Sequence, residues 1–180
     1  MNEDFLAVVE AKRFLGREFL TWLVHHVEEG GGKVDVEGGT IEITLGDRVV
    51  LEGGGIDRPR LTVVGQGDLG PELGAGLRRG KVVDRAHLVL TRGERRWELT
   101  LDGGMLTYDS LRCPELGERD HTADDPRVQF ENDLFLRLAD IDEAIGVLDG
   151  LFADFCKLRG ASAWSERTLP TLRRWVETLG

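Results

Sequence analysis

The sequence contains few of the residues from which metal and catalytic sites are built. It has two cysteines and four histidines among 180 residues, and no pair of them stands at the spacing of a zinc or haem motif. The patterns HExxH, CxxC and GxSxG are absent, and no loop has the alternating acidic positions of an EF-hand. We therefore expect no metal, no cofactor and no enzymatic activity.

Long apolar runs and a secretory start are also missing. No segment approaches the roughly 20 apolar residues that cross a bilayer, and residues 1–4 are acidic where a signal peptide is basic. Two cysteines make no disulfide framework, so we expect reduced thiols and a cytoplasmic protein without membrane contact. Hydrophobic residues at 41% and charged residues at 31% are ordinary for a folded domain.

The pattern that is present predicts one α+β domain over residues 1–180. Apolar residues recur at helical spacing over 11–29, and three glycines follow them. Short alternating segments separated by glycine turns fill 33–108, and such tight turns permit hairpins rather than parallel crossovers. Residues 127–179 are helical in pattern. We expect a central antiparallel sheet with an N-terminal helix and long C-terminal helices.

Three local features of the sheet are expected. Gly46-Asp47 predicts a turn between two strands, and residues 105–108 predict a short strand after a Gly-Gly turn. Residues 81–90 and 95–101 predict a hairpin, because both alternate and a single Arg-Gly turn separates them. One face of this hairpin is apolar and includes Trp97, so its other face is expected to be polar.

The long helical segment, residues 127–159, carries more large apolar residues than one buried stripe needs. Gly146 and Gly150 weaken it, so a kink or a break is expected near residues 139–142. The surplus apolar surface, followed by the tryptophans Trp164 and Trp175, predicts a homodimer that buries part of it.

Charge is segregated along the chain, which has a formal net charge of −10. Between Arg78 and Arg96 there are seven basic and two acidic residues, whereas between Glu115 and Asp154 there are twelve acidic and three basic ones. The overall balance argues against a general nucleic-acid-binding protein, but the basic segment does not.

The basic hairpin is the candidate binding site. Its polar face and the residues leading into it could contact phosphates without reading bases; the candidates are Arg78, Arg79, Lys81, Arg85, His87 and Arg96. The alternative is an ordinary solvated sheet face on which arginines pair with glutamates across strands. Both interpretations remain open at the level of sequence.

One glycine pattern suggests a different ligand. Residues 65–70 read GxGxxG after a predicted strand, but a dinucleotide site also needs a parallel β-α-β unit. The neighbouring strands are expected to be antiparallel and the next helix short, so we interpret this segment as a plain loop. The acidic residues after Glu115 are likewise interpreted as solvated faces.

Three segments, taken in order, resemble the C-terminal part of the recombination-associated protein RdgC family. These are residues 14–23 (FLGREFLTWL), the step 80–83 (GKVV) with a following strand that ends at Asp102-Gly103, and residues 130–135 (FENDLF) opening a long helix. The N-terminal half of the family has no counterpart in this chain, and no individual binding residue is transferred from the family.

The resemblance implies a protein that binds duplex DNA without sequence preference, restrains a recombinase and forms a ring-shaped dimer with a basic inner surface. Sequence-independent binding to double-stranded DNA in recombination or replication, with a nucleoid location, is therefore the first expectation. The alternative is a homodimeric protein-interaction module that does not bind DNA. A third interpretation is an acidic DNA mimic.

Overall fold

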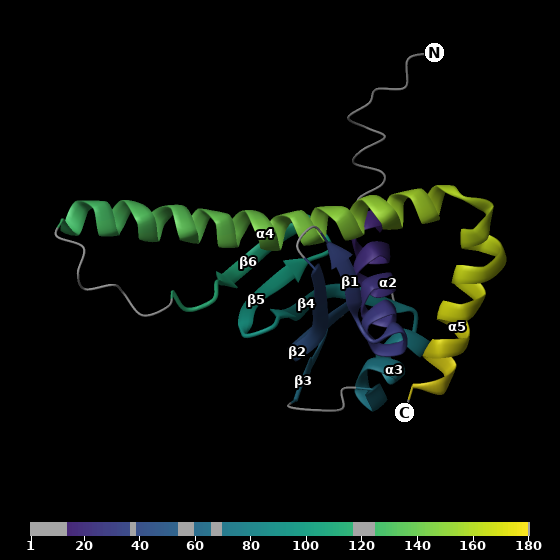
Figure 1. Ribbon diagram of the computed structural model, residues 1–180. Helices are drawn as coiled ribbons and strands as arrows, with labels where there is room; N and C mark the ends of the chain where they lie inside the picture. The colour runs from purple at the N-terminus through teal and green to yellow at the C-terminus, as the bar shows by residue number, and fades with distance from the viewer. Residues whose placement is uncertain (1–13, 37–38, 54–59, 66–69, 117–124, 180) are drawn as a thin grey trace, which may run out of the picture.

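The computed structural model describes residues 14–36, 39–53, 60–65, 70–116 and 125–179. The described chain alternates short strands and helices and then ends in helices (Figure 1). Its elements are α2 (Phe14–Gly30), β1 (Lys33–Val36), β2 (Gly39–Gly53), β3 (Leu61–Val64), α3 (Gly70–Arg78), β4 (Lys81–Arg92), β5 (Arg95–Asp102), β6 (Thr107–Arg112), α4 (Pro126–Gly160), the π-helix η1 (Trp164–Thr168) and α5 (Leu169–Thr178).

The six strands form one sheet in the order β1-β2-β4-β5-β6, and β3 pairs with β2. Every described strand pair is antiparallel, so the predicted α+β class is confirmed. The same pairing provides no parallel β-α-β unit for the GxGxxG segment, of which residues 66–69 lie outside the described part. The predicted hairpin is also confirmed, with Leu90 opposite Trp97 and Leu88 opposite Leu99.

The helices pack on one face of the sheet. Alternating strand residues such as Ile43, Leu88 and Trp97 join Phe19 of α2 and Phe155 of α4 in one buried cluster. The rings of Phe19 and Phe155 lie 5.5 Å apart. Alternation of strand side chains places the intervening polar residues on the opposite face.

Helix α2 is fixed at its first turn against the turn between β5 and β6. A Cβ atom at Gly16 would lie 2.2 Å from the carbonyl oxygen of Gly103, so only glycine permits this approach. The next residue, Arg17, donates to Asp84, whose side chain is almost fully buried, at 2.6 Å. A close backbone contact and an ion pair thus orient α2 on the sheet.

One sheet prediction is wrong and another is shifted along the chain. Gly46-Asp47 is no turn: β2 runs continuously from Gly39 to Gly53, and the residues between Leu45 and Val49 form a bulge. The expected strand at 105–108 begins later, at Thr107, because the Asp102 carboxylate accepts bonds from the backbone of Gly104 and Met105 and closes a turn there.

The expected break in the long helix is wrong as well. Helix α4 is continuous over 35 residues and runs straight above the sheet (Figure 1). A Cβ atom at Gly146 or Gly150 would meet nothing within 4 Å, so these glycines mark no close packing. The buried face of α4, from Asp140 to Phe155, holds the helix through this region. Among the described residues, no helix is long and apolar enough to span a membrane.

Candidate interaction surface

Three of the six predicted phosphate-binding residues, Arg78, Arg79 and Lys81, lie where α3 ends and β4 begins. Arg78 donates to the carbonyl oxygens of Val176 at 3.1 Å and Leu179 at 2.6 Å, and so satisfies the C-terminal end of α5. Lys81 donates to the carbonyl oxygen of Gly53 at 2.8 Å, and Arg79 is exposed. Arg78 and Lys81 therefore link elements of the fold.

The other three, Arg85, His87 and Arg96, lie on strands β4 and β5, and each has an acidic neighbour. The distances are 2.8 Å from Arg85 to Asp102, 2.7 Å from His87 to Asp47 and 2.8 Å from Arg96 to Glu98. Of these three pairs, only that of Arg85 with Asp102 joins an arginine to a carboxylate across strands, because Arg96 and Glu98 both lie on β5. Whether any of these residues contacts DNA stays a prediction.

The remaining hairpin arginines explain the segregation of charge along the chain. Arg95 lies 2.6 Å from Asp140 and 2.7 Å from Glu143, and Arg92 forms an ion pair with Glu143. Trp97, fully buried, donates from its indole to the carbonyl oxygen of Asp140 at 2.9 Å. The basic hairpin therefore binds the acidic helix through ion pairs and one hydrogen bond. We call these five residues the clasp.

The contacts of the clasp shift the pKa of one of its own members, Arg95. Burial by itself lowers the pKa of Arg95, but the bond to Asp140 and the field of Glu143 outweigh it, and the net direction is upward. Nearby, burial raises the pKa of the Cys113 thiol, and Asp140 adds to this effect. Cys113 therefore stays protonated and is a poor nucleophile.

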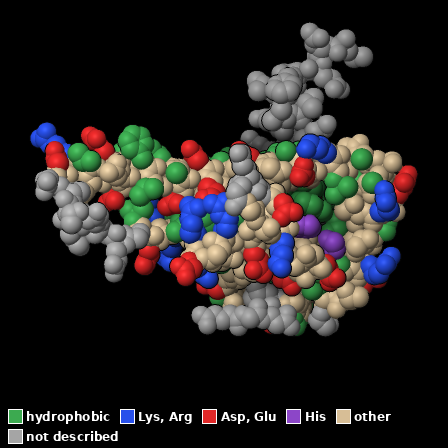
Figure 2. All heavy atoms as spheres, viewed as in Figure 1, with side chains coloured by type: hydrophobic (Ala, Val, Ile, Leu, Met, Phe, Trp, Pro, Cys, Tyr) green, Lys and Arg blue, Asp and Glu red, His purple; other side chains and the backbone are tan. Residues whose placement is uncertain are grey.

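Helix α4 has two unlike halves on either side of the clasp. All its buried residues lie between Asp140 and Phe155. Residues 126–139, which we call the arm, extend beyond the sheet (Figure 1), and at the left of Figure 2 hydrophobic side chains lie among charged ones. Its exposed large apolar side chains are Val128, Phe130, Leu134, Phe135, Leu136 and Leu138, with both phenylalanines 68% exposed.

Most of these side chains lie on one side of the arm. At 3.6 residues per turn, all of them except Leu136 fall within an arc of about 160°. The polar side of the arm turns toward the domain: Arg137 donates to the carbonyl oxygen of Pro114 and lies 3.7 Å from Asp140. Phe130 lies at the edge of the arc, about 20° around the helix from Arg137, whereas Val128, Phe135 and Leu138 lie about 100° or more from it and point away from the domain.

The apolar surface of the arm is large for a monomer. With roughly 200 Å² for each complete side chain and the observed exposures, the six residues offer on the order of 600 Å². Typical monomers rarely expose more than roughly 300–600 Å² in one patch. None of these six side chains is buried against the described residues, since each is 47–68% exposed. The arm is therefore the leading candidate for an interaction site.

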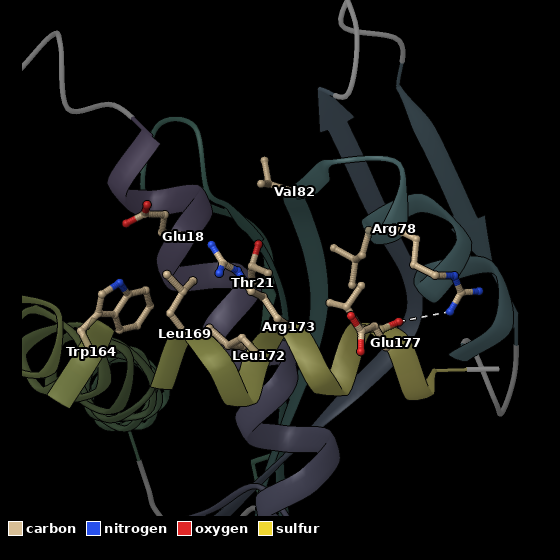
Figure 3. Close-up of a pocket in the computed structure, with 11 residues that line it drawn as sticks. Glu18, Thr21, Arg78, Val82, Trp164, Leu169, Leu172, Arg173 and Glu177 are labelled. Carbon is tan, nitrogen blue, oxygen red and sulfur yellow. Dashed lines mark hydrogen bonds between the residues drawn. The ribbon is translucent and has the colours of Figure 1, made fainter. Parts of the chain in front are cut away.

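A groove of about 480 Å³ lies between α2, α3 and α5. Its wall is largely apolar, and Figure 3 shows Leu169 and Leu172 on α5 facing α2 across it. Arg173 and Glu177, of opposite charge, lie on the same helix at its rim. Because the rim carries both signs, the groove favours no single class of charged ligand.

The sequence correctly indicated surplus apolar residues in the long helix but placed part of the surplus wrongly. Trp164 and Trp175 are 7% and 4% exposed and belong to the chain's own core. Within the described ranges, no three His, Cys, Asp or Glu side chains lie together as metal ligands would. No family model matches the chain, and no curated protein matches it either.

Proposed function

We propose that this protein is a homodimeric interaction module whose arm pairs with the arm of a second copy. The observation that carries the proposal is the row of five exposed apolar side chains on one side of a helix whose other half packs in the core. An exposed apolar row of this size lowers the solubility of a protein unless a binding partner buries it, because contact between apolar surface and water is unfavourable.

Charge supports a second copy as the occupant. The whole chain is acidic, so two copies repel one another at long range. The arm itself is neutral, with Arg127 and Arg137 balanced by Glu131 and Asp133. Two arms therefore meet without bringing a net like charge together, so local charge does not oppose an interface in which the same patch meets itself.

The area also fits a dimer of micromolar affinity. Without Leu136, which lies outside the arc, two arms would bury roughly 1,100 Å², just below the roughly 1,200 Å² at which the range for stable protein interfaces begins. An interface of that size with aromatic residues at its centre typically gives affinities from nanomolar to micromolar. We therefore expect a dimer at micromolar concentration.

The test compares the mass of three proteins in solution by light scattering over a concentration series. The double variant Phe130→Ala and Phe135→Ala removes both aromatic rings of the arm. The control is Met105→Ala, because Met105 is 67% exposed and lies in the turn between β5 and β6. All three changes are on the surface, so stability should change by less than about 0.5 kcal/mol.

The wild type and the control should show a mass near 40 kDa, twice the 20.0 kDa of one chain. The dimer dissociation constant of the double variant should be at least 100-fold higher than that of the wild type, because truncating two interface aromatics costs about 3 kcal/mol in binding. Equal masses for all three proteins would refute the arm as the interface.

Duplex-DNA binding, which the RdgC-like segments imply, stays a prediction and is the competing function. The ion pairs of Arg85 and Arg96 leave those side chains less able to neutralise phosphates, since their charge is already balanced. The DNA-mimic interpretation is weakened in a similar way, because Asp140 and Glu143 of the acidic region bind the chain's own hairpin.

A further inference from the structure

A second candidate site lies on the sheet face opposite the helices, and it is independent of the arm. A polar hollow of about 330 Å³ opens there between four strands. Residues of β2, β4, β5 and β6 line it: Asp47, Arg48, His87, Glu98, Leu99, Thr100, Ser110 and Arg112. All of its lining residues come from the sheet, so the hollow is a feature of the sheet alone.

His87 is held in one orientation at the edge of the hollow. Its ring lies against the β2 bulge, where a Cβ atom at Gly46 would be 2.3 Å from the Nδ1 atom. The Nδ1 atom lies 2.7 Å from Oδ1 of Asp47, so the Nδ1 proton is donated to that carboxylate. This bond is the first cause of the lowered pKa of Asp47. The Nε2 atom is then the ring nitrogen available to a ligand.

Three arginines and two carboxylates set the charge of this region. Glu98 is bound by Arg96 at 2.8 Å and lies 3.5 Å from Arg112, so its carboxylate is already compensated. Arg112 is 80% exposed at its side chain. Arg48 has no ion pair among the described residues. Two arginines and two carboxylates line the hollow, and Arg96, which binds Glu98 from outside it, leaves Arg48 and Arg112 as the arginines open to a ligand.

The backbone adds a further sign of a specialised site. Ser110, on the wall of the hollow, has a φ of 58°, in the left-handed region that a residue with a side chain rarely adopts. It lies at a register shift between β5 and β6, so β6 bulges beside Glu98 and Thr100. A strained residue of this kind costs on the order of 1–3 kcal/mol and is common at binding sites.

We propose that this hollow binds a tetrahedral oxyanion, a phosphate or sulfate group, between Arg48 and Arg112. Arginine provides the charge and the paired donors that suit such an anion. The hydroxyl groups of Ser110 and Thr100 supply neutral donors, whereas Nε2 of His87 has no proton to donate while Nδ1 carries it. The walls carry two arginines and two carboxylates, and each carboxylate already has a partner, Asp47 in His87 and Glu98 in Arg96.

The experiment is calorimetric titration with sodium sulfate, and chloride is adjusted to hold ionic strength constant. The wild type should bind one sulfate per chain with a dissociation constant on the order of 1 mM. The variant Arg48→Ala with Arg112→Ala should bind at least tenfold more weakly. The control, Arg173→Ala with Arg174→Ala on α5, removes the same charge elsewhere and should bind as the wild type does.

No saturable binding by the wild type would overturn the proposal, and so would equal weakening by the two double variants, because charge alone would then explain it. A folded far-ultraviolet spectrum is required of each variant before titration. These results do not depend on the mass measurements on the arm, so either proposal can fail alone.

The source of the phosphate group is resolved in a parallel titration with a short duplex DNA of mixed sequence. A duplex that competes with sulfate, and whose log–log salt slope falls by about 2 in the Arg48 and Arg112 variant, identifies phosphodiesters as the ligand. Sulfate binding without duplex binding identifies a site for free anions. Both results support the anion site, and only the second rejects DNA.

Discussion

Asp140 is the residue at which the hairpin and the long helix depend on each other, and the change Asp140→Asn tests that dependence. The substitution keeps the size of the side chain and removes its charge. It weakens the contacts at 2.6 Å to Arg95 and 3.7 Å to Arg137. The hydrogen bond from the Trp97 indole remains possible, because its acceptor is the backbone oxygen of residue 140 and not the side chain.

The magnitude follows from the exposure of the partners. Breaking a fully buried ion pair costs about 3–5 kcal/mol, whereas exposed pairs are worth about 0–1 kcal/mol. The Asp140 side chain is 10% exposed and that of Arg95 is 39% exposed, which places this pair between the two cases. We expect a loss of about 2 kcal/mol in the free energy of unfolding.

Urea denaturation at fixed protein concentration measures this loss as a shift of the midpoint with an unchanged slope. The control is Asp154→Asn on the same helix, where the pair with Lys157 at 2.9 Å is exposed on both sides. It should change stability by less than about 0.5 kcal/mol. The same small shift for both variants would refute the clasp as a stabilising contact.

Two further predictions concern the core and its response to pH. Trp97→Ala should cost about 3–5 kcal/mol in urea denaturation, because the ring is fully buried; a loss below about 1 kcal/mol would contradict its place in the core. Burial lowers the pKa of His25, with a smaller lowering by His26 and an opposing effect of Glu29. The unfolded chain therefore takes up this proton first as the pH falls, so the His25 contribution is complete above the ordinary imidazole pKa and is lost below it. His25→Phe keeps the edge-on contact with Trp175, at 5.1 Å between ring centroids, and should flatten the stability curve between neutral and mildly acid pH; an unchanged curve would reject this cause.

The sequence was most informative where one local pattern decides the structure. Alternation on both sides of Arg92-Gly93 predicted the hairpin of β4 and β5, and its register follows from that turn. Helical spacing predicted α2 and its end to within one residue, and residues 11–13 of the prediction lie outside the described residues. In these segments, short-range propensity and long-range packing favour the same conformation.

The sequence was misleading where tertiary packing overrides a local signal. Gly46 suggested a turn, but the residue is small because the ring of His87 lies against it. Gly146 and Gly150 suggested a break, but the packed residues around them, including Val147 and Leu151, keep α4 helical. The presence of a glycine does not show whether it makes room for a neighbouring side chain or ends a helix or strand.

The candidate sites were only partly predictable for a related reason. Charge segregation between the hairpin and the helix suggested a ligand for the basic residues, yet the two segments bind each other through Arg95 and Asp140. Arg48 and Ser110, which line the polar hollow, lie far apart in sequence and were not singled out. The bulges that bring them together depend on pairing between distant strands.

Hydrogen exchange measured by mass spectrometry, as a function of protein concentration, tests the central claim most directly. The account predicts that peptides covering residues 126–139 gain protection as concentration rises through the dimer dissociation constant. Peptides covering residues 140–155, which the chain's own core already holds, should keep the same protection throughout. Concentration-independent exchange in the arm at about 100 μM, where even a micromolar dimer is populated, would contradict it.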